Sequence, residues 1–279
     1  MVRKMKEILI EAKNIHFAYD DNEILKGINF SVSKGEKIAV MGSNGAGKST
    51  FFLNLNGVLL PDDGEIFIEG KKIGKREINE LRRKVGFVFQ DADSQIIASN
   101  VRAEISFGPM NMGLRKDEVI KRVDDAVKYM DLTDLQDRAP HYLSGGEKKR
   151  VSIADILAME PEILIFDEPM AALDPVNAEN VENILNRLYS DGKTIITATH
   201  DVDFAYRFAD RVVVFSKGNI IADGTPDEIF KRSEILKEAN LKKPAVMTIW
   251  EALEKKGAVK GKCPKTSEEA AMAIIACNK

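Results

Sequence analysis

The stretch 42–49, GSNGAGKS, matches the pattern G-x-x-x-x-G-K-[ST] of a phosphate-binding loop. Its glycines would let backbone N–H groups curl around phosphate oxygens, and the N-terminus of a following helix would add partial positive charge. Lys48 would reach the β- and γ-phosphates, and the Ser49 hydroxyl would ligate Mg²⁺. A merely flexible glycine loop is the alternative, which the strand expected before it and the helix expected after it disfavour. The residues predicted to hold the nucleotide here are Gly42, Ser43, Asn44, Gly45, Ala46, Gly47, Lys48, Ser49 and Thr50.

Two carboxylates, Asp167 and Glu168, directly follow the apolar run 163–166, ILIF. A run that is apolar throughout is typical of a strand buried on both faces of a parallel sheet, and ligands bind at the carboxyl edge of such sheets. Asp167 could hold Mg²⁺ through water, and Glu168 could act as general base toward an attacking water. An acidic pair that simply caps the next helix is the alternative, which the phosphate loop in the same chain disfavours.

Ser144, Gly145 and Gly146 open a helical stretch and are followed by Glu147. Free N–H groups and a helix dipole at such a start form a second geometry that suits an anion. Because a single triphosphate does not need two such sites, this helix could cap the nucleotide of a second subunit. A plain N-cap with flexible glycines remains the alternative.

These groups need strands and helices to position them, and the hydrophobic pattern predicts both. Strands are predicted over residues 7–19, 28–32, 37–41, 65–69, 85–89, 162–166, 194–198 and 211–215. Helices are predicted over residues 48–56, 176–189 and 202–208, and the pattern is helical from 100 to about 159. This alternation indicates an α/β core with a helical insertion in its middle. The charged run 71–84 is predicted to be a solvated face, and residues 245–279 a small helical appendage.

Length and composition narrow the class of protein. The 279 residues suit one or two domains, and 41 Lys and Arg against 44 Asp and Glu give a net charge of −3, so no basic excess points to nucleic acid. No apolar run approaches the roughly 18 residues of a membrane span, and residues 1–13 lack a signal-peptide core. Cys263 and Cys277 share no metal-ligand spacing, and a reducing cytosol fits them. We expect a cytosolic protein, or one attached to a membrane through a partner.

The phosphate loop, the stretch LSGGE at 143–147 and the strand ILIFDEP at 163–169, in that order, resemble the nucleotide-binding subunit of ATP-binding-cassette (ABC) proteins. The resemblance covers about residues 5–235. It implies an α/β fold with a P-loop NTPase core, in which a mostly parallel sheet is joined by an N-terminal antiparallel β subdomain. It also implies a nucleotide-binding domain over 1–243, with a helical subdomain at about 91–160, and a C-terminal helical element over 244–279.

Single residues extend this resemblance. Gln90 resembles the family's glutamine loop, 172–174 its aspartate loop, His200 its switch histidine and Tyr19 the aromatic that stacks on adenine. The resemblance implies ATP and Mg²⁺ as cofactors, and a head-to-tail dimer that sandwiches two ATP molecules. It implies catalytic roles for Glu168, His200 and Gln90, metal contacts from Ser49, Gln90 and Asp167, and contacts to the second subunit's ATP from Ser144, Gly145 and Gly146. Glu147 stands where Gln is usual, which many members tolerate.

Residues 89–114 are the most discriminating part of the chain. Their patterns FQ-x-x-x-x-Q and FGP-x-N-x-G-L resemble energy-coupling-factor importers, especially the cobalt and nickel type. In the family this region receives the coupling helix of a membrane protein, and Ile96, Ile97, Phe107 and Met110 could form such a groove. Ordinary packing of the helical subdomain is the alternative. Residues 263–270 resemble the family's C-terminal helical element, and a simple dimerisation or packing hairpin is the alternative there.

We therefore predict an ATPase, the motor subunit of an energy-coupling-factor importer for cobalt or nickel ion or a vitamin. Its partners would be a second ABC ATPase subunit, identical or paralogous, and integral membrane coupling and substrate-binding subunits, with no nucleic acid. It would lie peripherally on the cytoplasmic side of the cell membrane. A soluble ABC ATPase acting on nucleic acid or ribosomes is one alternative, although that class usually needs two cassettes, a coiled coil or a basic face. The ATPase of an exporter, which needs transmembrane helices of its own or of a partner, is another.

Overall fold

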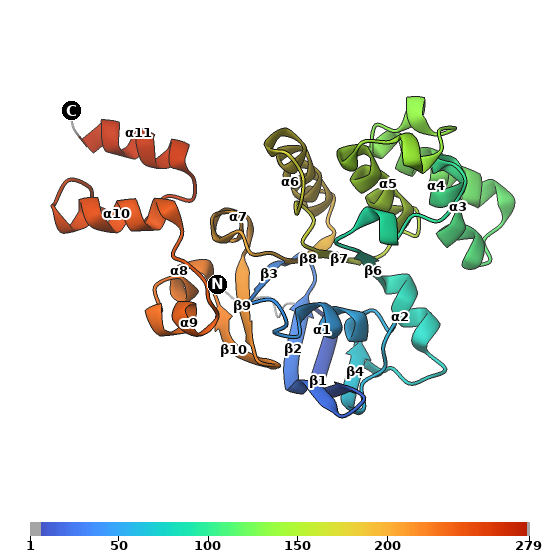
Figure 1. The fold of residues 1–279 in the computed structure, drawn as a ribbon, viewed down its shortest axis with the longest axis horizontal. Helices are drawn as coiled ribbons and strands as arrows, with labels where there is room; N and C mark the ends of the chain where they lie inside the picture. Colours follow the sequence, from blue (N-terminus) through green and yellow to red (C-terminus); the bar gives the residue numbers. More distant parts are fainter. Residues whose placement is uncertain (1–6, 278–279) are drawn as a thin grey trace. The chain divides into compact units, whose positions relative to one another are not determined.

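The computed structural model describes residues 7–277 and divides into two compact units (Figure 1). The first unit contains residues 7–36 and 49–198, and the second contains residues 37–48 and 199–277. Both units combine strands and helices, as the alternating sequence pattern predicts.

An antiparallel sheet begins the first unit. It contains β1 (Ile8–Tyr19), β2 (Asn22–Ser33), β4 (Asp63–Ile68) and β5 (Lys71–Lys72), in the order β2-β1-β4-β5. Buried and exposed side chains alternate along parts of β1 and β2, because one face of this sheet covers the core. The predicted strand 28–32 is too short, since the hairpin with β1 carries β2 from Asn22 to Ser33.

Three parallel strands complete the sheet structure of the first unit. β6 (Val85–Val88), β7 (Ile163–Asp167) and β8 (Thr194–Ala198) lie in that order, and every residue in them is buried. Asp167 pairs with Ala198 at the last position of β7, so the carboxyl ends of β7 and β8 lie together. The prediction of fully buried strands with Asp167 at the edge is confirmed.

Helices fill the rest of the first unit. They are α1 (Lys48–Leu55), α2 (Ile78–Lys84), α3 (Val101–Asn111), α4 (Lys116–Tyr129), α5 (Gly145–Leu157) and α6 (Pro175–Ser190), with 3-10 turns at Ala92–Ser94, Thr133–Leu135 and Pro140–Tyr142. Gly108 of α3 lies close to the segment just after α5, because an added Cβ would lie 2.7 Å from Met159 Cγ. The helical pattern of residues 100–159 thus resolves into three helices that pack on one another (Figure 1).

The second unit has its own parallel strand pair, β3 (Lys37–Met41) and β9 (Arg211–Ser216), and β9 continues into a hairpin with β10 (Asn219–Gly224). Its helices are α7 (Val202–Phe208), α8 (Pro226–Ile229), α9 (Ser233–Glu238), α10 (Ala245–Lys255) and α11 (Ser267–Cys277). Val246, Met247 and Ala270 of the predicted appendage join the buried cluster of this unit around Tyr206. The last two helices lie side by side (Figure 1). The appendage is therefore packed against a core.

The sequence pattern missed some short elements. In the charged run 71–84, predicted as a solvated face, α2 buries only Leu81, and its remaining side chains are partly or fully exposed. β10 has a weak apolar pattern, with only Ala222 buried, and it pairs antiparallel with β9. Between residues 7 and 277, no helix has the length and apolar character that a bilayer span requires.

Candidate functional site

The phosphate loop of the second unit is shaped by its glycines. β3 ends at Met41, and Gly42 follows with φ of +141°, so close to β9 that a Cβ there would lie 2.2 Å from the Phe215 carbonyl oxygen. Gly45 and Gly47 also have positive φ, of +77° and +101°. L-residues with side chains rarely adopt these angles, so the spacing of the glycines fixes the path of the loop.

Lys48 closes the loop and begins α1. Its side chain is buried, and Nζ donates to the carbonyl oxygens of Gly42 at 2.7 Å and Ser43 at 3.2 Å. Its ammonium group is thus held against the loop itself. Ser49 is exposed and Thr50 half-buried in the first turn of α1, and this helix has no acidic residue there. A positive helix end with an exposed hydroxyl suits a phosphate and its counter-ion.

The predicted carboxylates lie at the end of β7 in the first unit. Asp167 is 7% exposed, and Glu168 turns the chain with φ of +45°. The Glu168 N–H donates to the Ala198 carbonyl oxygen at 3.2 Å, and the Glu168 carbonyl oxygen accepts from the Ala171 N–H at 3.0 Å. This turn takes Glu168 out of the strand and leaves its side chain half-buried beside Asp167.

Gln90 is exposed just beyond β6, and a buried lysine of α5 holds its backbone. Lys149 is 3% exposed, and its Nζ donates to the carbonyl oxygens of Gln90 at 2.7 Å and Phe89 at 3.0 Å. Burial lowers the pKa of Lys149 to about 8, and the negative charges of Asp91 and Asp167 oppose that shift. The Lys149 ammonium group thus links the backbone of Gln90 to α5, a link that the sequence pattern did not reveal.

Ser144 caps α5 in a reciprocal pair with Glu147. The Ser144 hydroxyl accepts from the Glu147 N–H at 3.3 Å, and the Glu147 carboxylate accepts from the Ser144 N–H at 2.7 Å. The hydrogen bond from the Ser144 N–H to the carboxylate is the main cause of the lowered pKa of Glu147, and the Ser144 side chain adds to it. A carboxylate at this position, where Gln is usual in the family, therefore serves the helix cap.

The glycines after Ser144 differ in their surroundings. A Cβ on Gly146 would lie 2.1 Å from the Asn177 side-chain oxygen, whereas one on Gly145 would meet only Leu173, at 3.9 Å. Asn177 belongs to the start of α6, where its N–H donates to the Asp174 carboxylate at 3.0 Å. The start of α5 and the aspartate loop are therefore packed directly on each other. The D-x-x-N spacing of a helix cap is the sequence signal that could have singled out Asn177.

Tyr19 and His200 lie in different units. Tyr19 ends β1, is 47% exposed, and stands edge-on to Phe17 with ring centroids 4.9 Å apart. His200 is exposed between β8 and α7, and the next residue, Asp201, caps α7 by accepting from the Phe204 N–H at 2.9 Å. Both rings are accessible to a ligand.

The predicted metal contacts are a serine hydroxyl, a glutamine amide and an aspartate carboxylate. Such oxygen donors suit Mg²⁺, which is usually held by one or two protein groups together with phosphate oxygens and water. Within the described chain, no cluster of three or more His, Cys, Asp or Glu offers a metal site made by protein alone. The donor set therefore fits a metal that arrives with a nucleotide.

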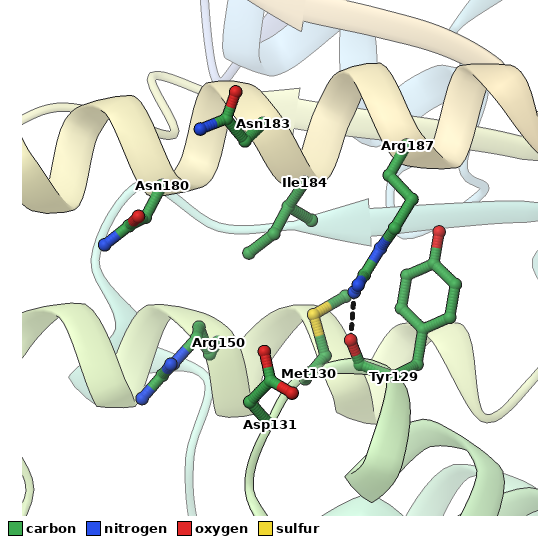
Figure 2. A pocket seen from close by; sticks show the side chains of 8 residues that line it. All are labelled: Tyr129, Met130, Asp131, Arg150, Asn180, Asn183, Ile184 and Arg187. Atoms are coloured by element: carbon green, nitrogen blue, oxygen red, sulfur yellow. Dashed lines mark hydrogen bonds between the residues drawn. The ribbon is translucent and has the colours of Figure 1, made fainter.

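A separate cavity of about 260 Å³ lies in the first unit, lined by Tyr129, Met130, Asp131, Arg150, Asn180, Asn183, Ile184 and Arg187. Figure 2 shows the side chains of α6 on one side and Arg150 of α5 on the other. Arg187 donates to the Tyr129 carbonyl oxygen and lies over its ring, with 3.8 Å between guanidinium carbon and centroid. None of the predicted nucleotide residues lines this cavity, so it is distinct from them.

Comparison with known proteins decides the family. The family description "ABC transporter" matches residues 25–171, a segment that spans the phosphate loop and both carboxylates. The chain belongs to the ABC transporter family. Its fold is the P-loop ABC ATPase fold, in which an antiparallel N-terminal sheet joins a mostly parallel sheet with helices.

Relatives within the ABC transporter family are similar over nearly the whole chain. The energy-coupling factor transporter ATP-binding protein EcfA of Methanocaldococcus jannaschii is 48% identical over 251 residues, which cover 89% of this chain and 90% of that protein. The solved structure of cbiO1 from Clostridium perfringens, part of the ABC transporter complex cbiONQ, has a TM-score of 0.74 and 40% identity, covering 89% of this chain and 100% of that one.

A third relative bears on the reaction. The ATP-binding cassette MJ0796, solved as a dimer in a post-hydrolysis state with ADP and phosphate, has a TM-score of 0.69 and 29% identity, covering 78% of this chain and 99% of that one. Like other cassettes of the ABC transporter family, this chain is an ATPase, and we expect it to convert ATP to ADP and phosphate.

Proposed function

We propose that this chain is the ATP-hydrolysing motor subunit of an energy-coupling-factor importer. The observation that carries the proposal is 48% identity over 251 residues to an energy-coupling factor transporter ATP-binding protein. The similarity to cbiO1, which belongs to a membrane transporter complex, supports the same function. The cargo would be a micronutrient, cobalt or nickel ion or a vitamin, bound by a separate membrane subunit.

Each predicted residue has a task in this mechanism. Lys48 and the backbone of residues 42–50 bind the phosphates of ATP, and Tyr19 stacks on adenine. Ser49, Gln90 and Asp167 would hold Mg²⁺, which would supply positive charge to the phosphate oxygens. Glu168 accepts a proton from the attacking water, while His200 donates a hydrogen bond to the γ-phosphate.

The motor would work as a head-to-tail dimer with an identical or paralogous ATPase. Ser144, Gly145 and Gly146 would then contact the ATP bound by the partner subunit, which suits their place at the start of α5. ATP binding closes such a dimer and hydrolysis reopens it, which moves the attached membrane subunits. We assign residues 1–243 to the nucleotide-binding domain, with the helical subdomain at about 91–160, and residues 244–279 to the C-terminal element; residues 1–6 and 278–279 lie outside the described part of the chain.

The surface expected to receive a coupling helix is available in the structure. Ile97, Phe107 and Met110 are 71%, 51% and 63% exposed, and Ile96 is half-buried. We name these residues the apolar face of the helical subdomain. Exposed apolar groups of this kind favour a protein partner. In the proposed importer, the chain would be attached to integral subunits on the cytoplasmic side of the membrane.

One variant tests the nucleotide assignment. Lys48→Ala should abolish tight ATP binding, because the ammonium group that contacts the phosphates is lost, and isothermal titration with ATP and Mg²⁺ measures this. Lys116→Ala, at an exposed position of α4, is the matched control and should bind ATP like the wild type. Unchanged affinity of the Lys48 variant would contradict the phosphate-loop assignment.

Purification of the chain from detergent-solubilised native membranes tests the transport role. Small hydrophobic integral proteins that co-purify would support the importer, and the one that binds cargo would identify it. A ribosomal or nucleic-acid companion in place of such proteins would overturn the transport role and leave the ATPase.

A further inference from the structure

Residues 89–98, which we call the glutamine segment, have almost no regular structure. After β6 ends at Val88, this segment contains one short 3-10 turn, Ala92–Ser94, before α3 begins at Val101. It nevertheless carries both Gln90, expected at the metal, and Ile97 of the apolar face. A segment without a ladder of backbone hydrogen bonds depends on side chains for its position.

Two buried side chains, those of Lys149 and Glu104, and the half-buried Gln95 supply much of that support. Lys149 donates to the carbonyl oxygens of Phe89 and Gln90, as described above. The Gln95 side chain accepts from the Phe89 N–H at 3.2 Å and donates to the Ser152 carbonyl oxygen of α5 at 2.8 Å. Glu104 of α3 accepts from the N–H groups of residues 97 and 98 at 2.9 and 2.6 Å. The glutamine segment is thus attached at its start to α5 and at its end to α3.

The contact made by Lys149 has a higher free-energy cost than that made by Gln95, because it buries a charged ammonium group. Lys149 is 3% exposed and its Nζ donates to two neutral carbonyl oxygens, whereas a buried ammonium group normally needs a carboxylate as its hydrogen-bond partner. An apolar side chain would pack in the same place at lower cost, and the carbonyl oxygens of an exposed segment could bond to water. The free-energy cost of burying the Lys149 ammonium group is explained if the position of Gln90 matters more for function than the stability of the fold.

We propose that Lys149 is a positioning residue for the ATPase reaction: by holding the Phe89 and Gln90 carbonyl oxygens, it fixes the Gln90 side chain relative to α5. The proposal rests on the proposed function, in which Gln90 contacts Mg²⁺ and the attacking water. Lys149 then acts on turnover through Gln90, and it leaves ATP affinity to the phosphate loop.

A double-mutant cycle with Gln90 tests this inference on the full chain. Lys149→Met removes the donors and keeps the length of the side chain, so kcat should fall at least tenfold while the Kd for ATP, measured without Mg²⁺, changes less than twofold. In the Gln90→Ala background the same substitution should change kcat less than twofold, because there is no glutamine side chain left to position. Lys149→Arg, which keeps the donors, should recover most of the lost turnover.

The control is Lys121→Met, at an exposed position of α4, which should leave kcat unchanged. An equal fall in kcat with and without Gln90 would overturn the inference, since the lysine would then act through stability alone. If the wild-type chain does not hydrolyse ATP, or if Gln90→Ala is as fast as the wild type, the proposed function itself is wrong. If Lys149→Met does not fold, Lys149→Gln replaces it in the same cycle.

Discussion

Glu168 follows β7 in a left-handed backbone conformation, and its side chain is half-buried. Glu168→Gln keeps the shape and removes the proton acceptor, so ATP should still bind while hydrolysis falls more than tenfold and the ATP-bound dimer accumulates. Steady-state phosphate release and size-exclusion chromatography with ATP measure the two effects. Glu179→Gln, exposed on α6, should behave as the wild type; unaltered turnover of the Glu168 variant would exclude it as the base.

Asp155 of α5 gives the stability of the fold a pH dependence. Burial raises its pKa to about 7, with the charge of Glu104 adding to the shift and the hydrogen bond from Gln95 opposing it. Because the folded pKa lies above the unfolded value of about 4, the stabilisation is full below pH 4 and is lost as the pH rises through about 7.

From this shift we expect the free energy of unfolding to be about 1.4 kcal/mol lower at pH 8 than at pH 6 because of Asp155. Urea unfolding at both pH values measures the loss, and Asp155→Asn should remove that part of it. Asp125→Asn, exposed on α4, is the control and should keep the wild-type difference. If Asp155→Asn shows the same stability difference between pH 6 and pH 8 as the wild type, Asp155 is not the cause of that difference.

At the residue scale, motif spacing predicted the residues that do chemistry, whereas only the packing revealed the buried role of Lys149. Asp167 and Lys48 follow from their motifs because phosphate and metal chemistry needs these groups at fixed offsets. Lys149 does not follow, since in the run Glu147 to Arg150 it looks like any other surface cation. Helix geometry separates that run: Lys148 pairs with Asp93, while Lys149 is buried against backbone carbonyl oxygens.

At the scale of elements, the contact between α5 and α6 makes two adjacent glycines unequal. Gly146→Ala should lower the free energy of unfolding by about 1–3 kcal/mol, because its Cβ would overlap the Asn177 side chain. Gly145→Ala has room and should change it by less than about 1 kcal/mol. Chemical denaturation compares the two.

Adding Asn177→Ala to Gly146→Ala should recover part of the loss, because the smaller side chain makes room for the methyl group. Equal effects of the two glycine substitutions, or no recovery in the double variant, would show that this packing does not hold the start of α5.

Elements were predictable where burial is complete. Every residue of β7 and β8 is buried, and short, mostly apolar runs of this kind are typical of strands in a parallel sheet. β2 extends beyond its apolar centre because cross-strand hydrogen bonds continue into polar residues, and α2 has a single buried side chain. A pattern based on hydrophobicity does not detect elements defined mainly by backbone pairing.

At the scale of the whole molecule, we expect the apolar face to serve attachment to membrane subunits and not ATP binding. Replacing both Phe107 and Met110 by Asp should leave the Kd for ATP within about twofold, while membrane subunits no longer co-purify, because charged groups oppose burial in an apolar interface. Ile120→Asp, at an exposed apolar position on α4, is the control and should keep the membrane subunits. Continued co-purification of the double variant would place the attachment elsewhere.

The burial of Lys149 also makes its amine a reporter of motion. A reagent that acylates amines would reach the exposed Lys121 of α4 at once, but it would reach Lys149 only during moments when the glutamine segment detaches from α5. The rate at which Lys149 is modified, read by mass spectrometry against Lys121 in the same sample, therefore measures how often the segment opens. Repeating the measurement with ATP, and then with membrane subunits, would show which of them closes the segment and which releases it.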